Sequence, residues 1–210
     1  MSALSIASPE HCRYCGHAIG VVWPSVALKG YRYADGTTIC QPCHERAVKD
    51  DAALLHAWRF TVDACTKLGL HASWGDVKVR LRDKSKLAGM SGSDCAIGLA
   101  RSRRCGLLSE SDISIIYGMP MGQAIMTLAH EAGHVWCHQH QIIFSPAELE
   151  EGFCNVLACM VVQQLDECLN PQTLIHALFS DPDPVYGAGF RQEWAKVEKL
   201  SWAEYLKRVQ

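Results

Sequence analysis

Residues 130–134 read His-Glu-Ala-Gly-His, and this pentapeptide constrains the fold more than any other part of the sequence. Positions i and i+4 of an α-helix lie on the same face, so His130 and His134 can direct their imidazoles at one metal ion. Glu131 then flanks that ion as a candidate general base. Two imidazoles are two of the three protein ligands that a catalytic zinc requires. The motif therefore predicts a zinc peptidase site carried by a helix.

The residues around the pentapeptide are typical of a buried helix. Apolar side chains recur at helical spacing across residues 123–139, and no proline interrupts them. Upstream, the β-branched and aromatic run 113–117, closed by Gly118 and Pro120, predicts a strand that ends just before the helix. We expect this strand to pair with an extended peptide substrate.

Two residues compete for the role of third ligand. His140 follows His134 by six residues, which is the spacing of the metzincin pattern HExxHxxGxxH, but Cys137 occupies the glycine position at which the chain turns. The alternative is a carboxylate of the segment that begins at Pro146, which predicts a second helix with acidic residues in its first turns. Glu151 from that helix would complete a gluzincin arrangement, that is, HExxH plus a downstream Glu.

Other carboxylates of this second helix remain possible. Glu150 is the next candidate for the ligand, whereas acidic residues such as Glu148 at a helix start usually face solvent and interact with the helix dipole. Gly152, directly after Glu151, is expected to let the two helices pack closely.

The first fifty residues contain a second metal motif, made of two Cys-x-x-Cys pairs. The four cysteines are Cys12, Cys15, Cys40 and Cys43. Paired thiolates at this spacing predict a tetrahedral structural zinc in a treble-clef or LIM-like module. Possible alternative ligands are His11, His17 and His44, although thiolates are softer. The module is either a docking surface for a protein partner or a small fold held together by zinc.

Three segments resemble one known family. They are residues 127–136 around the pentapeptide, residues 150–158, which begin Glu-Glu-Gly-Phe, and residues 186–191, which read Tyr-Gly-Ala-Gly-Phe-Arg. They resemble the peptidase domain of the plant LIM-containing, ubiquitin-activated growth-regulatory peptidases and their bacterial relatives, over roughly residues 75–210. The resemblance implies a gluzincin-type zinc peptidase with zinc at His130, His134 and Glu151.

The resemblance also implies a candidate residue for stabilising the oxyanion. At some positions this chain departs from the family's pattern. Tyr186, with Arg191 second, is expected to stabilise the oxyanion, because their glycine-containing motif recurs in that family. Plant members carry bulky apolar residues where this chain has Ala132 and Gly133, and glycine costs a helix about 1 kcal/mol relative to alanine. No acidic ubiquitin-interacting helix precedes the cysteine motif, so the sequence does not support a role for ubiquitin.

Composition excludes several classes of function. The formal net charge is -2 and the basic cluster at residues 101–104 is short, so nucleic acid is not expected as a partner. No segment approaches the roughly 20 apolar residues of a membrane span, and no signal peptide is evident, so we expect a cytoplasmic protein. We expect five of the eleven cysteines to be small buried thiols, which indicates a reducing compartment. They are Cys65, Cys137, Cys154, Cys159 and Cys168.

Together these patterns predict an α+β protein. Residues 8–49 form the treble-clef or LIM-like zinc module, and residues 50–210 form a zincin-like metallopeptidase domain whose segment 50–70 is a connecting helix capped at Asp50 or Asp51. Strands are expected at 77–81 and 96–100, a loop at 89–94, and a helix from Pro146 that extends up to residue 169. Ser201 is expected to cap the last helix.

The predicted activity is peptide hydrolysis. One catalytic zinc activates a water molecule, Glu131 removes its proton and delivers it to the leaving amine, and a second zinc is structural. The substrate is a peptide or a specific protein. The alternative is a zinc-dependent, protein-binding adaptor with a degenerate site, which would hold metal only at the four cysteines.

Overall fold

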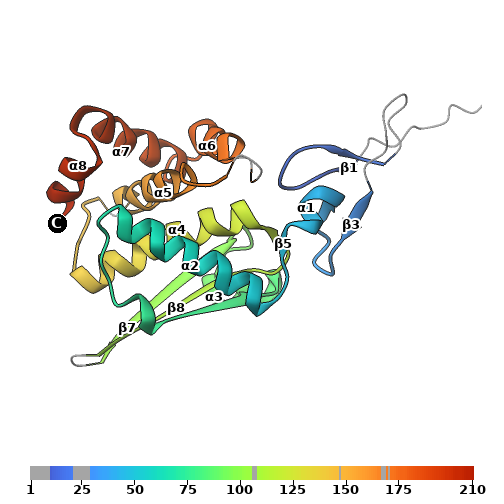
Figure 1. Cartoon of the computed structure of the whole chain (residues 1–210), viewed down its shortest axis with the longest axis horizontal. Helices are drawn as coiled ribbons and strands as arrows, with labels where there is room; N and C mark the ends of the chain where they lie inside the picture. The colour runs from blue at the N-terminus through green and yellow to red at the C-terminus, as the bar shows by residue number, and fades with distance from the viewer. Residues whose placement is uncertain (1–9, 21–28, 106–107, 147, 167–168, 170) are drawn as a thin grey trace, which may run out of the picture.

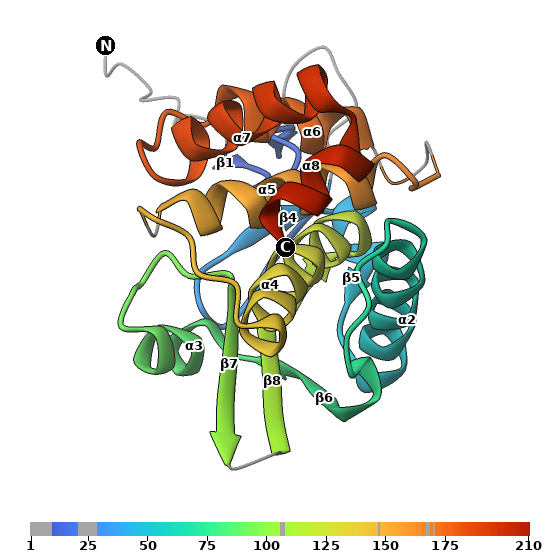
Figure 2. The same ribbon diagram turned by 90° about the vertical axis from the view of Figure 1, so that its left-hand side faces the viewer.

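The computed structural model describes residues 10–20, 29–105, 108–146, 148–166, 169 and 171–210. It is a mixed α+β structure, as predicted. In the larger part of the molecule, α4 (Met121–His140) lies between a three-stranded sheet and an outer group of helices (Figures 1 and 2). The outer helices are α5 (Glu148–Val162), α6 (Pro171–Ser180), α7 (Tyr186–Leu200) and α8 (Trp202–Val209). The helix with the pentapeptide is therefore the centre of the fold.

The sheet contains β6 (Val77–Arg82), β7 (Gly98–Cys105) and β8 (Leu108–Ile116) in the order β6-β8-β7. β6 runs parallel to β8 and β7 runs antiparallel to it. The expectation that residues 113–117 pair with a substrate is wrong, because β8 is flanked by a strand on both sides. The strand expected at 96–100 begins two residues later, as β7, and β7 forms an edge of the sheet.

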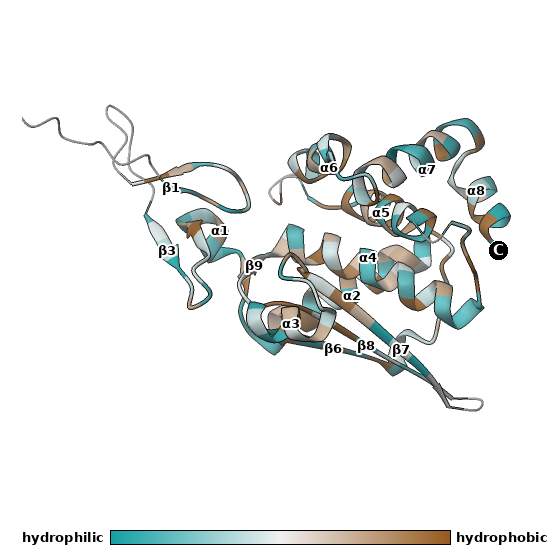
Figure 3. Cartoon of the chain, turned by 180° about the vertical axis from the view of Figure 1, so that it is seen from behind, coloured by the Kyte–Doolittle hydropathy of each residue, from teal (hydrophilic) through white to brown (hydrophobic). Residues whose placement is uncertain are grey.

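α4 is apolar because it is covered on both sides. Ala124, Leu128, Ala132 and Val135 recur at helical spacing and are fully buried, and α4 packs chiefly on α5 and on the sheet. This confirms the helix predicted over 123–139. In Figure 3 the apolar colour is most continuous along α5, whereas α7 and α8 alternate between apolar and polar residues.

Glycines set how closely the helices approach. A β-carbon at Gly133 of α4 would lie 2.7 Å from the Cys154 sulfur of α5, and one at Gly152 of α5 would lie 2.6 Å from the Gly189 carbonyl oxygen of α7. The role expected of Gly152 therefore concerns a different pair of helices, since Gly152 brings α5 against α7. Gly133 provides the close contact between α4 and α5.

The N-terminal part consists of two hairpins and a short helix. β1 (Glu10–His11) pairs with β2 (Ala18–Ile19), and β3 (Gly30–Arg32) pairs with β4 (Thr38–Cys40), which leads into α1 (Gln41–Glu45). This part has a small core of its own, formed by Cys12, Ile19, Ile39 and Cys40. Such a core is too small to hold a fold by apolar burial alone.

A two-stranded ribbon joins this part to α4. β5 (Ala47–Val48) pairs with β9 (Met119–Pro120), which directly precedes α4. The Gly118 amide donates to the Val48 carbonyl oxygen at 2.9 Å, and the Met121 amide donates to the Arg46 carbonyl oxygen at 2.8 Å. The cysteine-containing part is therefore attached to the first turn of the central helix.

The connecting helix is α2 (Asp51–Lys67), and the Asp50 carboxylate caps it by accepting from the Ala53 amide at 2.8 Å. Leu55 of this helix is an apolar residue that is 42% exposed. A turn at Trp74–Asp76 then leads into β6. Ser201 caps α8 as predicted, because its side chain accepts from the Glu204 amide.

Two other expectations are corrected. Residues 89–91 of the loop expected at 89–94 belong to a helix, α3 (Lys84–Ser91). The helix from residue 148 ends at Val162, before a turn. Among the thiols predicted to be buried, Cys65, Cys137, Cys154 and Cys159 are buried, and Cys168 lies outside the described residues.

Candidate metal centres

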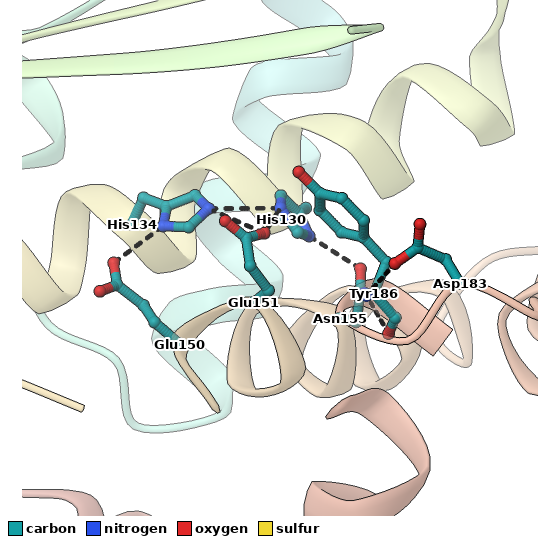
Figure 4. A network of polar contacts seen from close by, with 7 residues as sticks. All are labelled: His130, His134, Glu150, Glu151, Asn155, Asp183 and Tyr186. Carbon is teal, nitrogen blue, oxygen red and sulfur yellow. Dashed lines mark hydrogen bonds and ion pairs between the residues drawn. The ribbon is translucent and has the colours of Figure 1, made fainter. Parts of the chain in front are cut away.

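His130 and His134 of α4 and Glu151 of α5 converge on one point between the two helices (Figure 4). The two Nε2 atoms are 3.3 Å apart, and Oε2 of Glu151 lies 3.1 Å from Nε2 of His130 and 3.5 Å from Nε2 of His134. Ligand atoms bonded to a tetrahedral zinc at about 2.0–2.1 Å lie about 3.3 Å from one another. The three atoms therefore have the spacing of one face of a zinc coordination tetrahedron.

The hydrogen bonds of the two imidazoles determine which nitrogens remain available. Oδ1 of Asn155 lies 2.8 Å from Nδ1 of His130, and Oε1 of Glu150 lies 2.8 Å from Nδ1 of His134. Both oxygens accept, so each Nδ1 carries the proton and donates it. The Asn155 amide is oriented in turn, because its Nδ2 donates to the Tyr186 carbonyl oxygen at 3.1 Å. Each Nε2 therefore presents a lone pair.

Glu151 supplies a third lone pair at the same point. Its Oε2 is buried and has no hydrogen-bond donor among the described residues. Burial acts to raise the pKa of Glu151, but positive charge at His130 and His134 would outweigh it and lower the pKa below the ordinary value, so this carboxylate favours a positively charged neighbour. Three partly buried acceptors about 3.3 Å apart repel one another unless a cation lies between them. The donor set therefore fits a divalent metal with one carboxylate and two imidazoles, such as zinc.

Glu131 points from α4 toward the edge strand β7. It is 7% exposed, and a β-carbon at Gly98 would lie 2.5 Å from its Oε1, so only glycine fits there. Burial raises the pKa of Glu131, although His130, His134 and the backbone amide of Ala100 act to lower it. A carboxyl group in this setting is suited to take up and release a proton.

Tyr186, at the first turn of α7, lies beside His130. Their ring centroids are 6.3 Å apart, and Tyr186 is 46% exposed. Burial and the negative charges of Glu151 and Glu131 raise the pKa of Tyr186, so its hydroxyl remains a donor. The second nominee, Arg191, is not part of this group, because its Nη1 donates to the backbone oxygens of Phe179 and Asp181.

A cavity of about 830 Å³ opens over these residues. Its walls come from β7 and the segment before it, from α4 and α5, and from the connection between α6 and α7. His130, Glu131, His134, Glu151 and Tyr186 all line it. The candidate ligands, the candidate base and the candidate oxyanion donor therefore face one space that a substrate can enter.

The structure does not bring the metzincin alternative to this group. His140 is exposed, and its Nδ1 lies 3.0 Å from the Trp136 carbonyl oxygen. Glu150, the other alternative, contacts the outer nitrogen of His134, and Glu148 is exposed. His176 of α6 is also exposed. Among the candidates, Glu151 is the third group placed against both Nε2 atoms.

The four N-terminal cysteines form a second group. The sulfurs of Cys12, Cys15, Cys40 and Cys43 lie within 4.8 Å of one another. Sulfurs bonded to a tetrahedral zinc at about 2.3 Å are roughly 3.8 Å apart, so this cluster can hold zinc. Although burial raises it, the pKa of Cys12 is lowered to about 7 by hydrogen bonds from the backbone amides of Cys40, Cys15 and Tyr14.

The histidines near this cluster have other roles. His44 stacks on Tyr31 with ring centroids 3.8 Å apart and lies 3.0 Å from the Tyr33 hydroxyl. His17 directs Nδ1 at the Cys15 sulfur at 3.2 Å, which is a hydrogen-bond distance to a sulfur. The four-cysteine cluster is complete without either imidazole.

Sequence reasoning missed Asn155 and Gly98. Asn155 is a polar residue in the apolar part of α5, four positions after Glu151, so helical periodicity places both on the same face. That signal could have identified Asn155. The sequence contains no comparable signal for Gly98, whose role depends on how the sheet approaches α4.

Comparison with known families gives one match. The family model described as DA1-like, Protein DA1, matches residues 100–169, a third of the chain. The matched segment contains β8, α4 and α5, and with them His130, Glu131, His134 and Glu151. The four cysteines and Tyr186 lie outside it. No curated protein and no solved structure shows a significant similarity to the chain.

None of the helices in the described part of the chain combines the length and the apolar composition that crossing a bilayer requires.

Proposed function

We propose that this chain is a zinc-dependent peptidase of the gluzincin type with a zincin-like catalytic domain. The observation that carries the proposal is the convergence of two Nε2 lone pairs and the Glu151 carboxylate in a cavity that Glu131 also lines. The similarity of residues 100–169 to the DA1-like family supports it, because that segment contains all four residues.

Zinc at this site would supply an activated water molecule and polarise the scissile carbonyl group. Glu131 takes up the proton of that water and delivers it to the leaving amine. The buried setting that raises its pKa lets the carboxyl group hold this proton between the two transfers. The Tyr186 hydroxyl donates a hydrogen bond to the oxygen on which negative charge develops.

The edge strand β7 positions the substrate in this proposal. The backbone amide of Ala100 donates a hydrogen bond to the Glu131 carboxyl group, so the unpaired edge of β7 faces the candidate site. Gly98 and Ala100 line the cavity. An extended peptide added along this edge gains backbone hydrogen bonds and lies across the metal ligands. β7 therefore takes the role that the sequence suggested for residues 113–117.

We further propose that the N-terminal part is a treble-clef or LIM-like module with a structural zinc at Cys12, Cys15, Cys40 and Cys43. Two hairpins and a short helix that together present four thiolates are the arrangement expected of such a module. It is a candidate docking surface for a protein partner.

Substitution of the proposed base, Glu131, distinguishes the peptidase hypothesis from the adaptor hypothesis. Glu131→Gln is expected to leave about two zinc ions per chain and to abolish cleavage of an unbiased peptide library. Glu148→Gln, a matched substitution at an exposed position of α5, is expected to change neither. Retained turnover in Glu131→Gln would rule out the proposed base. Only one zinc per wild-type chain, at the cysteines, would favour the adaptor.

A further inference from the structure

The unpaired edge of β7 presents every second backbone group of that strand. Just before β7, the Ile116 amide donates to the Ile97 carbonyl oxygen at 3.2 Å, and in an antiparallel pair such bonds recur at alternate residues. Odd-numbered residues of β7 therefore bond to β8, and even-numbered residues point their backbone groups at the open edge. The hydrogen bond from the Ala100 amide to Glu131 agrees with this alternation. A peptide strand added here would pair in register with β7.

The side chains of β7 point alternately to the two faces of the sheet. A β-carbon at Gly98 would lie 2.5 Å from Cγ2 of Thr127 in α4, so the even-numbered side chains face α4. Leu99, Arg101 and Arg103 therefore lie on the face away from α4. Both arginines are exposed. Every second side chain of an added strand would lie beside them.

Arg101 is held next to the open edge. Asp112 lies directly opposite it on β8, but that carboxylate binds Nε of Arg80 on β6 at 2.7 Å. Arg101 donates instead to the Met90 carbonyl oxygen in the last turn of α3, which lies on the open side of β7 in Figure 2. A guanidinium has five N–H donors, so others remain for a carboxylate.

Arg103 lies two residues further along the same face. Glu110 lies opposite it on β8, and both side chains are exposed. Among the residues that the structure describes, no ion pair or hydrogen bond engages the Arg103 side chain. Its guanidinium can therefore bind a carboxylate of a strand on its open side. The formal net charge of the chain is -2, so these cations at one strand edge do not reflect a basic composition.

We infer that the substrate is an extended peptide with two acidic side chains, at positions i and i+2, that pair with Arg101 and Arg103. This inference rests on the proposed peptidase function and gives it a substrate class. In an antiparallel added strand, the residues opposite the two arginines form the non-hydrogen-bonded pairs, in which side chains approach most closely. The residue between them points to the α4 face and contacts neither arginine.

Binding to the Glu131→Gln protein with zinc tests the inference without turnover. The probes are fluorescent, end-blocked peptides of one threonine-rich sequence with two glutamates at a spacing of one, two or three residues. These isomers have the same composition and net charge, and a peptide that slides along the edge keeps its spacing. Anisotropy is expected to show about threefold tighter binding at a spacing of two than at one or three, because only that spacing reaches both arginines. Replacing both glutamates by glutamine should weaken binding about tenfold.

Glutamine variants identify the residues responsible. The preference for a spacing of two is expected to disappear in Arg101→Gln combined with Arg103→Gln, and thermal unfolding verifies that this variant is folded. Lys78→Gln is the matched control, because Lys78 is exposed on the same face of the sheet but lies on β6, with β8 between it and β7. Two strand spacings separate it from β7 by roughly 10 Å. This variant is expected to keep the preference.

The outcomes separate the acidic substrate from the peptidase. Binding that is indifferent to the spacing of the glutamates, or a spacing preference that survives both Gln substitutions, overturns the inference. Self-association of the double variant, with no acidic preference in the wild type, would show that the arginines only keep the edges of two copies apart, and overturns it as well. Cleavage by the wild-type protein without a Glu-x-Glu preference overturns the inference and leaves the peptidase. A spacing-dependent preference without any cleavage supports the acidic pairing and removes the proposed function.

Discussion

Gly133 of α4 and Cys154 of α5 meet where the two helices that carry the candidate ligands pack, and a β-carbon on Gly133 would lie only 2.7 Å from the Cys154 sulfur. His134 directly follows Gly133, and Glu151 lies one turn before Cys154. This contact therefore sets the distance between the imidazoles and the Glu151 carboxylate. Gly133, which weakens α4 as an isolated helix, lets α5 bring Glu151, the third candidate ligand, close to the two imidazoles.

Gly133→Ala is expected to destabilise the protein and loosen the His-His-Glu group. Alanine adds about 1 kcal/mol of helix propensity. Overpacking against Cys154 costs about 1–3 kcal/mol. The free energy of unfolding should therefore fall by about 1 kcal/mol, and zinc should bind more weakly at this site. Chemical denaturation and competition with a chelator measure the two effects.

Gly89→Ala is the matched control, because Gly89 lies in the helix α3 and a β-carbon there meets nothing within 4 Å. It should raise stability by up to about 1 kcal/mol. Equal stabilisation by both substitutions would show that the Gly133 contact is not tight.

Asn155→Ala is expected to weaken zinc binding while the fold persists. It removes the acceptor that holds Nδ1 of His130 at 2.8 Å, so the imidazole is free to turn. Loss of such a partner typically costs 10- to 100-fold in metal affinity, and we expect about tenfold here. Titration against a zinc-binding dye measures the affinity. An unchanged affinity would mean that the Asn155 amide does not orient the ligand.

Tyr186→Phe should lower kcat about 100-fold with little change in KM, because its hydroxyl is proposed to act only as negative charge develops. The ring beside His130 is kept, so zinc content should stay the same. Steady-state cleavage of the best library peptide provides both constants. A rise in KM at constant kcat would instead assign Tyr186 to ground-state binding.

Cys43→Ser tests whether the two metal groups are linked. Cys43 lies in α1, and the next strand, β5, pairs with β9 at the start of α4. Loss of the cysteine-bound metal should loosen this ribbon and weaken zinc binding at His130, His134 and Glu151 by about tenfold. Zinc titration of the variant measures the remaining site. Full affinity there would mean that the N-terminal module and the site are energetically independent.

The sequence predicted most of the central helix, α4, and the positions of His130, Glu131 and His134 on it. The spacing of His130 and His134 and the apolar periodicity around them require only local helical geometry. The cysteine pairs likewise bring four thiolates together, as the structure confirms. Helical geometry alone does not separate Glu151 from Glu150; Glu151 was preferred because Gly152 follows it, and the resemblance to a known family implied the same residue.

Relationships between distant elements were not predictable in the same way. Whether residues 113–117 form an edge or a central strand depends on where β6 and β7 pair, and no local pattern encodes that order. The exposure of Leu55 and His176 depends on which helices cover α2 and α6. The sequence indicated only that Gly133 lowers the stability of α4. Its contact with Cys154 was not predictable, because the two residues are distant in sequence.

A crystal structure of the zinc-loaded protein, with anomalous difference data collected at the zinc edge, tests the central claim most directly. The account predicts two peaks. One lies among the four cysteine sulfurs, and the other lies about 2.0–2.2 Å from Nε2 of His130, Nε2 of His134 and the carboxylate of Glu151. A single peak at the cysteines, or a second ion bound without Glu151, would contradict it.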